Sequence, residues 1–465
     1  MVGWEEKFEP FFRKMKEEDL PEIVINNFKH YYERLTQGQT GLIPETEILP
    51  LDALADMEAL PQEELRKIGE EAVPKTAIIK LNGGLGTSMG MERAKSLLKV
   101  KRSFSFLDII VRQTQGLGIP VIFMNSFSTR SDTLDALKAY PELWGKGMPV
   151  DFLQHKVPKV DASDLRPAEC PENPKLEWCP PGHGDIYPAL ATSGMLDRLL
   201  EEGYGYAFVS NADNLGAVLE PSVLGYFVNN NLSFMMEAAD RTKRDKKGGH
   251  LARLKSGRYI LREIAQCPEE DLEVFQDIQR HKYFNTNNIW IHLPALKDLM
   301  DRKKGVLELP MIRNRKTLDP RDPESKPVYQ LETAMGAAIA VFDAAGAIRV
   351  PRRRFSPVKN TNDLLVVRSD CYVLNNSFQV VPNPERKLGQ ILIDLDPGYY
   401  KLIDDFESRF PFGPPSLVNC ESLEVKGDFT FGRDVTLQGR VTLYNDKDKT
   451  FQIEDGRRIQ GEFRV

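Results

Sequence analysis

Residues 76–96 read Thr-Ala-Ile-Ile-Lys-Leu-Asn-Gly-Gly-Leu-Gly-Thr-Ser-Met-Gly-Met-Glu-Arg-Ala-Lys-Ser, and this stretch decides the fold. Its first part, residues 77–81, is a short, mostly apolar run that is typical of a buried parallel strand. Glycines follow at positions 83, 84, 86 and 90, and then comes Lys95. A turn rich in glycine directs backbone N–H groups inward, where they bind anionic oxygens. We therefore expect a phosphate-binding loop here, to which Lys95 adds a positive charge.

Two common phosphate-binding motifs do not fit this loop. A P-loop requires Gly-x4-Gly-Lys-Ser/Thr, but Ala94 stands where a glycine would precede Lys95. The dinucleotide fingerprint requires Gly-x-Gly-x-x-Gly, whereas Gly84, Gly86 and Gly90 are spaced one residue too long. On spacing alone, a glycine-rich turn that only connects a strand to a helix is the alternative interpretation.

The composition predicts a globular protein with a large core. Its 465 residues correspond to roughly two to four domains, and 41% hydrophobic with 28% charged residues is an ordinary balance. The net charge of −6 argues against general nucleic-acid binding, which needs a basic domain. The five cysteines are scattered without a Cys-x-x-Cys pair, which indicates a reducing compartment and no structural zinc.

The sequence gives no sign of a targeting or membrane segment. The first residues, Met-Val-Gly-Trp-Glu-Glu-Lys, lack the apolar core of a signal peptide. No run approaches the ~18 apolar residues of a membrane-spanning helix. We therefore expect no membrane partner and a cytoplasmic location.

Strand and helix signals alternate from residue 76 onward. Further short apolar runs are typical of strands, and they cover residues 119–125, 150–153, 206–210, 232–237 and 289–293. Helical patterns lie between them, at residues 132–139 and 187–200. This alternation predicts an α/β fold in which helices flank both faces of a mainly parallel sheet. Ligands of such folds bind beyond the carboxyl ends of the strands, where the glycine loop begins.

The two ends of the chain differ from this middle part. Residues 1–35 place apolar side chains three to four apart, which predicts an amphipathic helix packed on the main body. From about residue 420, apolar residues recur every six positions in two interleaved series: Leu423, Phe429, Val435 and Val441, and Val425, Phe431, Leu437 and Leu443. A six-residue period predicts a short β-helix, with a meander of hairpins as the alternative. We expect its open end to be a surface for homo-oligomer assembly.

These patterns divide the chain into three parts. We place an N-terminal helical segment at residues 1–74 and the α/β domain at residues 75–410. The β-helix follows at residues 411–465, after a boundary in the proline-rich stretch 411–415.

Two polar motifs are candidates for chemistry. His183 lies between two glycines in Pro180-Pro-Gly-His-Gly-Asp185, so its backbone can approach a ligand and its ring can donate to a phosphate or sugar oxygen. We interpret the other histidines as structural and Asp185 as a helix cap. Asp213 follows the apolar run at 206–210, and one carboxylate beside a nucleoside triphosphate suits Mg²⁺. An Asx-turn is the alternative at Asp213.

Weaker candidates lie farther along the chain. The amides at Asn285-Thr-Asn-Asn288 and the carboxylate of Glu332 could bind sugar hydroxyls, although such residues usually cap elements. The loop Lys246-Lys-Gly-Gly-His-Leu251 either touches substrate or is solvated. Lys359 follows a basic cluster at 352–354 and precedes a helix start at Thr361, so it could reach the phosphates from the other side.

The loop at residues 81–90 resembles the signature of the UDP-glucose pyrophosphorylase family, the eukaryotic-type UTP–glucose-1-phosphate uridylyltransferases. The resemblance spans about residues 75–445, and the N-terminal helix matches only loosely. It continues through the motifs at residues 125–127, 180–187, 210–217, 247–249, 284–288, 330–334 and 357–359. The resemblance implies a nucleotidyltransferase sheet followed by a small β-helix.

The resemblance also implies roles for individual residues. It assigns the nucleotide to Leu81, Asn82, Gly83, Gly84, Asn211, Ala212 and Asp213, with Gln154 and Gly182 on the uracil. It assigns the sugar phosphate to His183 and the sugar to Asn287 and Glu332. It makes Lys95 and Lys359 the catalytic, phosphate-binding lysines and Asp213 the Mg²⁺ ligand.

The implied reaction is attack by glucose-1-phosphate on the α-phosphorus of UTP, with release of pyrophosphate. Two departures accompany the resemblance: Arg93-Ala94 replaces the Gly-Pro that the family usually has before Lys95, and His250 stands where threonine is common. Two alternatives stay open. One is a uridylyltransferase that prefers galactose-1-phosphate, N-acetylglucosamine-1-phosphate or several sugars, and the other is a non-catalytic protein that binds nucleotide sugars.

Overall fold

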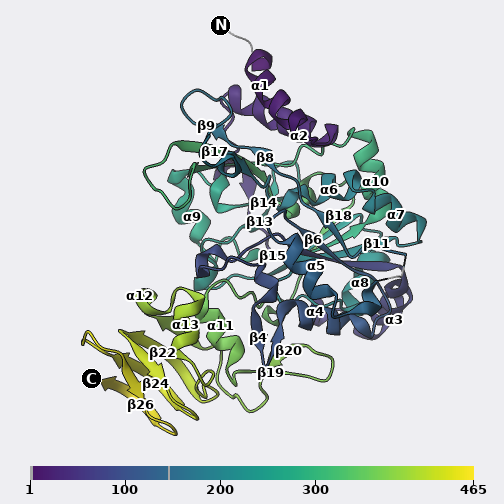
Figure 1. Ribbon diagram of the computed structural model, residues 1–465. Helices are drawn as coiled ribbons and strands as arrows, with labels where there is room; N and C mark the ends of the chain where they lie inside the picture. Colours follow the sequence, from purple (N-terminus) through teal and green to yellow (C-terminus); the bar gives the residue numbers. More distant parts are fainter. Residues whose placement is uncertain (1–3, 145–146) are drawn as a thin grey trace.

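The computed structural model of the chain describes residues 4–144 and 147–465. Its centre is a mixed sheet flanked by helices, with the N-terminal helices and the C-terminal strands at opposite ends of the molecule (Figure 1). The main path of the sheet contains, in spatial order, β2 (Ala55–Asp56), β18 (Ala345–Arg349), β12 (Phe234–Asp240), β15 (Tyr283–His292), β11 (Tyr206–Asn211), β3 (Thr76–Asn82), β6 (Val121–Asn125) and β7 (Asp151–Leu153).

Most neighbouring strands on this path run parallel. Strands β11, β3, β6 and β7 form one parallel group, and β12, β18 and β2 form a second. Strand β15 lies between the groups and pairs antiparallel with both β11 and β12. The predicted α/β fold with a mixed, mainly parallel sheet is therefore confirmed.

Helices cover both faces of the sheet. Because successive side chains of a strand point in opposite directions, neighbouring residues of β3 pack against helices on opposite faces. Ile79 of β3 packs on the side of α6 (Ile186–Thr192), α7 (Met195–Glu201) and α10 (Leu293–Arg302). Its neighbour Ile78 packs on the side of α4 (Phe106–Gln115) and α5 (Arg130–Leu137). Burial on both faces explains why β3 reads as a nearly continuous apolar run.

Two helix expectations need correction. The N-terminal pattern forms two helices, α1 (Trp4–Glu17) and α2 (Glu22–Thr36), because the chain turns at Asp19, whose φ is +52°, and at Pro21. The helix expected over 187–200 is likewise two helices, α6 and α7, which are separated at Gly194 with a φ of +72°. In both places a residue in the left-handed region ends the helix.

The C-terminal part is a stack of parallel strands. One sheet contains β21 (Leu392–Leu395), β22 (Cys420–Lys426), β24 (Thr436–Tyr444) and β26 (Arg458–Arg464), and a second pairs β23 (Phe429–Phe431) with β25 (Phe451–Ile453). Leu423 lies beside Val441, one coil later, and both side chains are buried. The stack includes β21, which precedes the boundary expected at residue 411.

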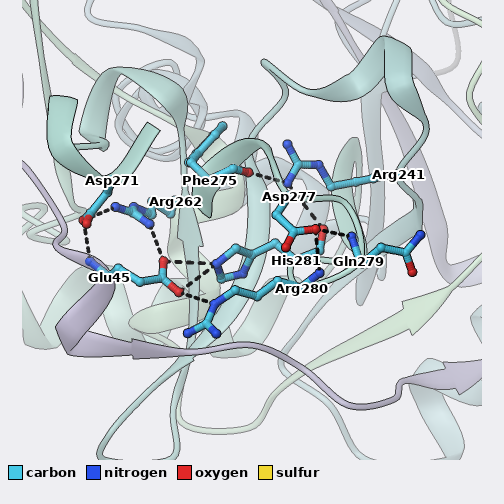
Figure 2. A network of polar contacts seen from close by, with 9 residues as sticks. All are labelled: Glu45, Arg241, Arg262, Asp271, Phe275, Asp277, Gln279, Arg280 and His281. Carbon is cyan, nitrogen blue, oxygen red and sulfur yellow. Dashed lines mark hydrogen bonds and ion pairs between the residues drawn. The ribbon is translucent and has the colours of Figure 1, made fainter. Parts of the chain in front are cut away.

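A buried polar network ties the segment before the sheet to the body of the protein (Figure 2). The carboxylate of Glu45 accepts hydrogen bonds from Arg262 at 2.8 Å, from Arg280 at 2.8 Å and from the Nε2 of His281 at 3.1 Å. Asp271 accepts from the other guanidinium nitrogen of Arg262 at 2.8 Å. Since the Arg262 side chain is fully buried, these two carboxylates supply the opposite charge and accept hydrogen bonds from its two terminal nitrogens.

Two histidines lie beside this network. The rings of His250 and His281 stack with their centroids 3.7 Å apart. Burial lowers the pKa of His250 well below 6.5, and His281, Arg241 and Arg262 add to this effect by charge repulsion. Burial also lowers the pKa of His281. Both rings are therefore neutral in the folded protein at neutral pH.

This pair predicts that the protein loses stability in mild acid. As the pH falls below about 6.5, the unfolded chain protonates these histidines more readily than the folded protein does, so the unfolded state binds more protons and the free energy of unfolding decreases. Replacing His250→Thr removes one of these sites. The free energy of unfolding should then change less steeply with pH, by up to about 1.4 kcal/mol per pH unit. Urea unfolding between about pH 7.5 and 5.5 measures this slope. An unchanged slope in the variant would contradict the assignment.

Candidate active site

The glycine loop and the Asp213 loop start side by side because their strands are neighbours. The parallel pairing of β3 with β11 places Leu81 opposite Asn211, which is the last residue of β11. The N–H of Ala212 then donates to the carbonyl of Leu81 at 3.0 Å. Residues 81–84 and 211–213 therefore lie together at the carboxyl ends of the strands, the edge at which such sheets bind ligands.

The glycine loop folds into a tight turn that returns Lys95 to this edge. Gly86 and Gly90 both have a φ of +72°, which glycine adopts without strain, and they flank a short 3₁₀ turn at Thr87–Met89. The N–H of Lys95 donates to the carbonyl of Gly84 at 3.1 Å. The Lys95 Nζ then lies 2.6 Å from the Oδ2 of Asp213.

Lys359 reaches the same place from a distant part of the sequence. The N–H of the preceding residue, Val358, donates to the carbonyl of Asp213 at 3.3 Å. The Ser88 hydroxyl in the glycine loop donates to the carbonyl of Lys359 at 3.5 Å. The structure thus brings together the three segments that carry Lys95, Asp213 and Lys359. These residues are two cations and one carboxylate.

The side chain of Asn82 has a structural role. Its Nδ2 donates to Asn125 at 2.8 Å and to Thr133 at 2.9 Å, so the amide joins β3 to β6 and α5. The side chain of Asn82 is buried as a result. A role for Asn82 toward a nucleotide would therefore use its backbone.

A second group of predicted residues gathers around Gly182. The Nε2 of Gln154 donates to the carbonyl of Gly182 at 2.9 Å, and a Cβ on Gly83 would lie 2.8 Å from the Gln154 Oε1. Gly182 itself has a φ of +80° and packs directly on the backbone of Thr333. Gly83, Gln154 and Gly182 therefore line one small region, and a side chain at 182 would not fit.

His183 is held in one tautomer. Its Nδ1 accepts the backbone N–H of Met335 at 2.9 Å, so the ring proton of the neutral form sits on Nε2. Burial lowers the pKa of His183 to about 4, which keeps the ring neutral at physiological pH. The ring therefore offers Nε2–H as a hydrogen-bond donor without carrying a charge.

Asp185 does not cap the helix that follows it, contrary to our expectation. It is the residue before α6, but its side chain makes no capping hydrogen bond. Its carboxylate instead accepts the backbone N–H of His155 at 2.7 Å, and its Oδ1 lies 3.0 Å from the His155 Nδ1. This contact joins the loop that carries His183 to the residue after Gln154, which supports the structural interpretation of His155.

The candidate sugar residues come from two different strands. Asn287 has a φ of +57°, and its backbone N–H donates to the Asn285 Oδ1 at 2.9 Å, where β15 is irregular. Glu332 belongs to β17 (Pro327–Thr333), and it lies against Gly182. Burial raises the pKa of Glu332, and a hydrogen bond from Asn314 acts in the opposite direction.

Glu263 is a site residue that the sequence interpretation missed. It follows β14 (Tyr259–Arg262), and the antiparallel pairing of β13 (His250–Leu254) with β14 brings it to Gly249. A Cβ on Gly249 would lie 2.6 Å from the Glu263 Oε1, so the carboxylate packs directly on this backbone. Burial raises the pKa of Glu263, while the charge of Lys359 and the Gly249 N–H lower it. The local sequence around Glu263 indicates only a capping box with Gln266, so the strand pairing is needed to reveal its place beside Gly249.

The donors present at this site suit a metal that is held mainly by its substrate. Within residues 4–144 and 147–465, no group of three or more His, Cys, Asp or Glu side chains is arranged to hold a metal ion. Asp213 offers a carboxylate at the carboxyl ends of β3 and β11, and Mg²⁺ typically uses one or two carboxylates with phosphate oxygens and water. In the part of the chain that the structure describes, no helix is both long and apolar enough to cross a membrane.

Known proteins resemble the chain over most of its length. The model of the UTP–glucose-1-phosphate uridylyltransferase family matches residues 25–438. The UTP–glucose-1-phosphate uridylyltransferase of Solanum tuberosum is 39% identical over 418 residues, covering 88% of this chain and 84% of the relative. The enzyme of the same name from Saccharomyces cerevisiae is 38% identical over 395 residues, covering 82% of this chain and 76% of the relative.

Solved structures agree with these matches. UDP-glucose pyrophosphorylase from Leishmania major, described in open and closed structures, has a TM-score of 0.90 and 43% identity and covers 98% of both chains. A mutant of the Leishmania major enzyme in complex with UDP-glucose gives a TM-score of 0.91 at 43% identity over 98% of this chain and 99% of that chain. The resemblance found in the motifs is confirmed, and the chain belongs to the UTP–glucose-1-phosphate uridylyltransferase family.

Proposed function

We propose that this chain transfers a uridylyl group from UTP to glucose-1-phosphate, giving UDP-glucose and pyrophosphate, and that it also catalyses the reverse reaction. One observation carries the proposal: in a chain of this family, Lys95 contacts Asp213 at the carboxyl ends of β3 and β11, and the backbone segment that carries Lys359 contacts the same Asp213 loop. Their positive and negative groups match a magnesium-bound triphosphate. The UDP-glucose complex of the Leishmania major relative supports the choice of nucleotide sugar.

The nucleotide would lie along the two neighbouring loops. Backbone groups at residues 81–84 and 211–213 face one edge of the sheet, where N–H groups can bind phosphate oxygens. Gln154 and Gly182 are joined by a hydrogen bond, and we assign them to the uracil. An amide side chain and a carbonyl together provide the donor and acceptor groups that a pyrimidine edge requires.

The sugar phosphate would lie between His183 and the irregular part of β15. The neutral His183 ring donates from Nε2, which suits a phosphate or sugar oxygen. Asn287 and Glu332 supply amide and carboxylate groups for hydroxyls, and we add Glu263 because its carboxylate faces the Gly249 backbone. A carboxylate can accept hydrogen bonds from two neighbouring hydroxyls of a hexose.

The reaction needs no protein nucleophile. A phosphate oxygen of glucose-1-phosphate forms a bond to the α-phosphorus of UTP, and the bond from that phosphorus to the β-phosphate oxygen breaks as pyrophosphate leaves. The protein aligns two anions and neutralises the charge of the leaving group, which is how phosphoryl transfers are generally accelerated. Lys95 and Lys359 provide this positive charge.

Asp213 would hold Mg²⁺, which when bound shields the phosphate charges and polarises the phosphorus. In the structure Asp213 neutralises Lys95 at 2.6 Å. Neither side chain is deeply buried, at 25% and 14% exposed, so exchanging this pair for a metal and a phosphate costs little.

Assembly through the C-terminal coils and the three-part domain division stay predictions.

The most direct test is a panel of sugar phosphates with UTP and Mg²⁺. We expect pyrophosphate release with glucose-1-phosphate, at a higher kcat/KM than with galactose-1-phosphate or N-acetylglucosamine-1-phosphate. A preference for either of the other sugars would correct the substrate. Absence of pyrophosphate release with every sugar, from protein that binds UDP-glucose, would show a non-catalytic binding protein.

Removing the ammonium group of Lys359 should slow turnover strongly. We expect Lys359→Ala to lose ~2–4 kcal/mol of transition-state stabilisation, as when one preorganised donor is deleted, which is roughly a 30- to 1,000-fold lower kcat/KM. Steady-state kinetics measure the loss. The exposed Lys255→Ala serves as the control and should match the wild type. Near-normal turnover of Lys359→Ala would exclude the role.

Asp213→Asn should weaken the metal dependence specifically. The variant keeps the shape of the side chain but removes its charge, so we expect half-maximal activity to need at least ~10-fold more Mg²⁺. A magnesium titration at saturating UTP measures this shift, with Asp135→Asn on the surface as the matched control. If Asp213→Asn lowers kcat while its magnesium requirement stays at the wild-type value, Asp213 is not the metal ligand.

A further inference from the structure

A buried ion pair lies behind the proposed catalytic edge and takes no direct part in the mechanism above. Glu237 of β12 is 0% exposed and Arg354 is 3% exposed. The guanidinium donates twice to the carboxylate, from Nε to Oε2 at 2.7 Å and from Nη2 to Oε1 at 2.6 Å. The Trp290 indole donates to the Glu237 Oε1 at 3.0 Å. Both charges are thus paired and hydrogen-bonded inside the protein.

Stability alone does not account for such a pair. Removing two charges from water costs as much as their attraction returns, and apolar replacements of buried pairs are often neutral or stabilising. What a bidentate pair supplies is a defined geometry between the segments that carry it. Glu237 and Arg354 are 117 residues apart in sequence, so the pair fixes two distant parts of the chain to each other.

The same contacts extend to two loops of the site. The carbonyl of Arg354 accepts hydrogen bonds from the Nδ2 atoms of Asn214, at 3.1 Å, and Asn288, at 3.3 Å. Asn288 also donates to the Glu237 Oε2 at 3.0 Å, and the Asn214 Oδ1 accepts the N–H of Ser356 at 2.9 Å. Asn214 directly follows Asp213, and Asn288 directly follows Asn287.

From Ser356 the connection continues to Lys359. The N–H of Val358 donates to the carbonyl of Asp213 at 3.3 Å. The ring of Phe355 packs edge-on against Phe284 with centroids 4.8 Å apart, and the Lys359 Nζ lies 5.8 Å from the centre of the Phe355 ring. The residues next to Arg354 therefore set both the backbone and the surroundings of the Lys359 side chain.

We infer that Glu237 and Arg354 are positioning residues for Lys359. Their ion pair holds residues 354–359 against the Asp213 loop and β15, so that the Lys359 ammonium group meets the departing pyrophosphate. The inference rests on the proposed uridylyl transfer. Since an error of about 1 Å in placing a catalytic group can cost on the order of 100-fold in rate, a rigid attachment of this segment matters for turnover.

The test removes the pair while keeping the core filled. The double variant Glu237→Gln with Arg354→Met removes both charges of the pair together, and the glutamine oxygen still accepts from the Trp290 indole. The control is Asp240→Leu with Arg349→Met, a partly exposed ion pair of 2.5 Å whose aspartate is on the same strand, β12, and whose arginine also pairs with Asp56 at 2.7 Å. Thermal unfolding and steady-state kinetics are measured for both.

We expect the Glu237/Arg354 variant to fold and to lose at least ~10-fold in kcat, with the KM for glucose-1-phosphate within ~3-fold of the wild type. The control should keep the wild-type kcat. The decisive comparison is made in a Lys359→Ala background, where the same double change should cause no further loss, because residues that act through Lys359 lose their effect without it.

Two results would overturn the inference: a kcat of the double variant within ~2-fold of the wild type, or a loss that recurs in full on top of Lys359→Ala. If the double variant does not fold, Arg354→Lys replaces it, since lysine keeps the charge but not the bidentate geometry. The same two results then decide. A wild-type protein without pyrophosphate release would instead refute the proposed function.

Discussion

The parallel pairing of β3 with β11 is the constraint on which the site depends. It sets the start of the glycine loop beside the Asp213 loop, and the turn through Gly86 and Gly90 then returns Lys95 to Asp213. A triphosphate and a sugar phosphate repel each other, so a protein that joins them must gather positive charge at one place. The fold does so with side chains from separate segments, and the carboxylate of Asp213 balances the charge of Lys95.

The partial exposure of this ion pair has a functional consequence. A deeply buried Lys–Asp pair would resist separation, because each charge would lose its only partner in a medium of low polarity. Because this pair is partly exposed, the proposed mechanism lets Lys95 turn to a phosphate and Asp213 to the metal. Two other groups are held more rigidly than this ion pair. The Arg354–Glu237 pair is buried and bidentate, and the His183 ring accepts a hydrogen bond from a backbone N–H.

The sequence predicted those features that depend on local pattern. Strands β3, β6 and β11 are buried on both faces, so they read as apolar runs, and glycines or polar residues at their ends marked the site. The start of β15 was missed because polar residues Asn285–Asn288 lie inside the strand, where their side chains bond to Glu237, to Arg354 and to one another. Glu263 and Arg354 were missed as site residues because their roles depend on pairing between distant segments.

The central claim is that Lys95, Asp213 and Lys359 act together on one polyphosphate. A crystal structure with UTP, Mg²⁺ and a non-reactive analogue of glucose-1-phosphate tests it most directly. The account predicts that the ammonium groups of Lys95 and Lys359 contact phosphate oxygens, and that Asp213 leaves Lys95 to bind the metal. A structure in which Lys95 keeps its contact with Asp213 while the phosphates bind elsewhere would contradict it.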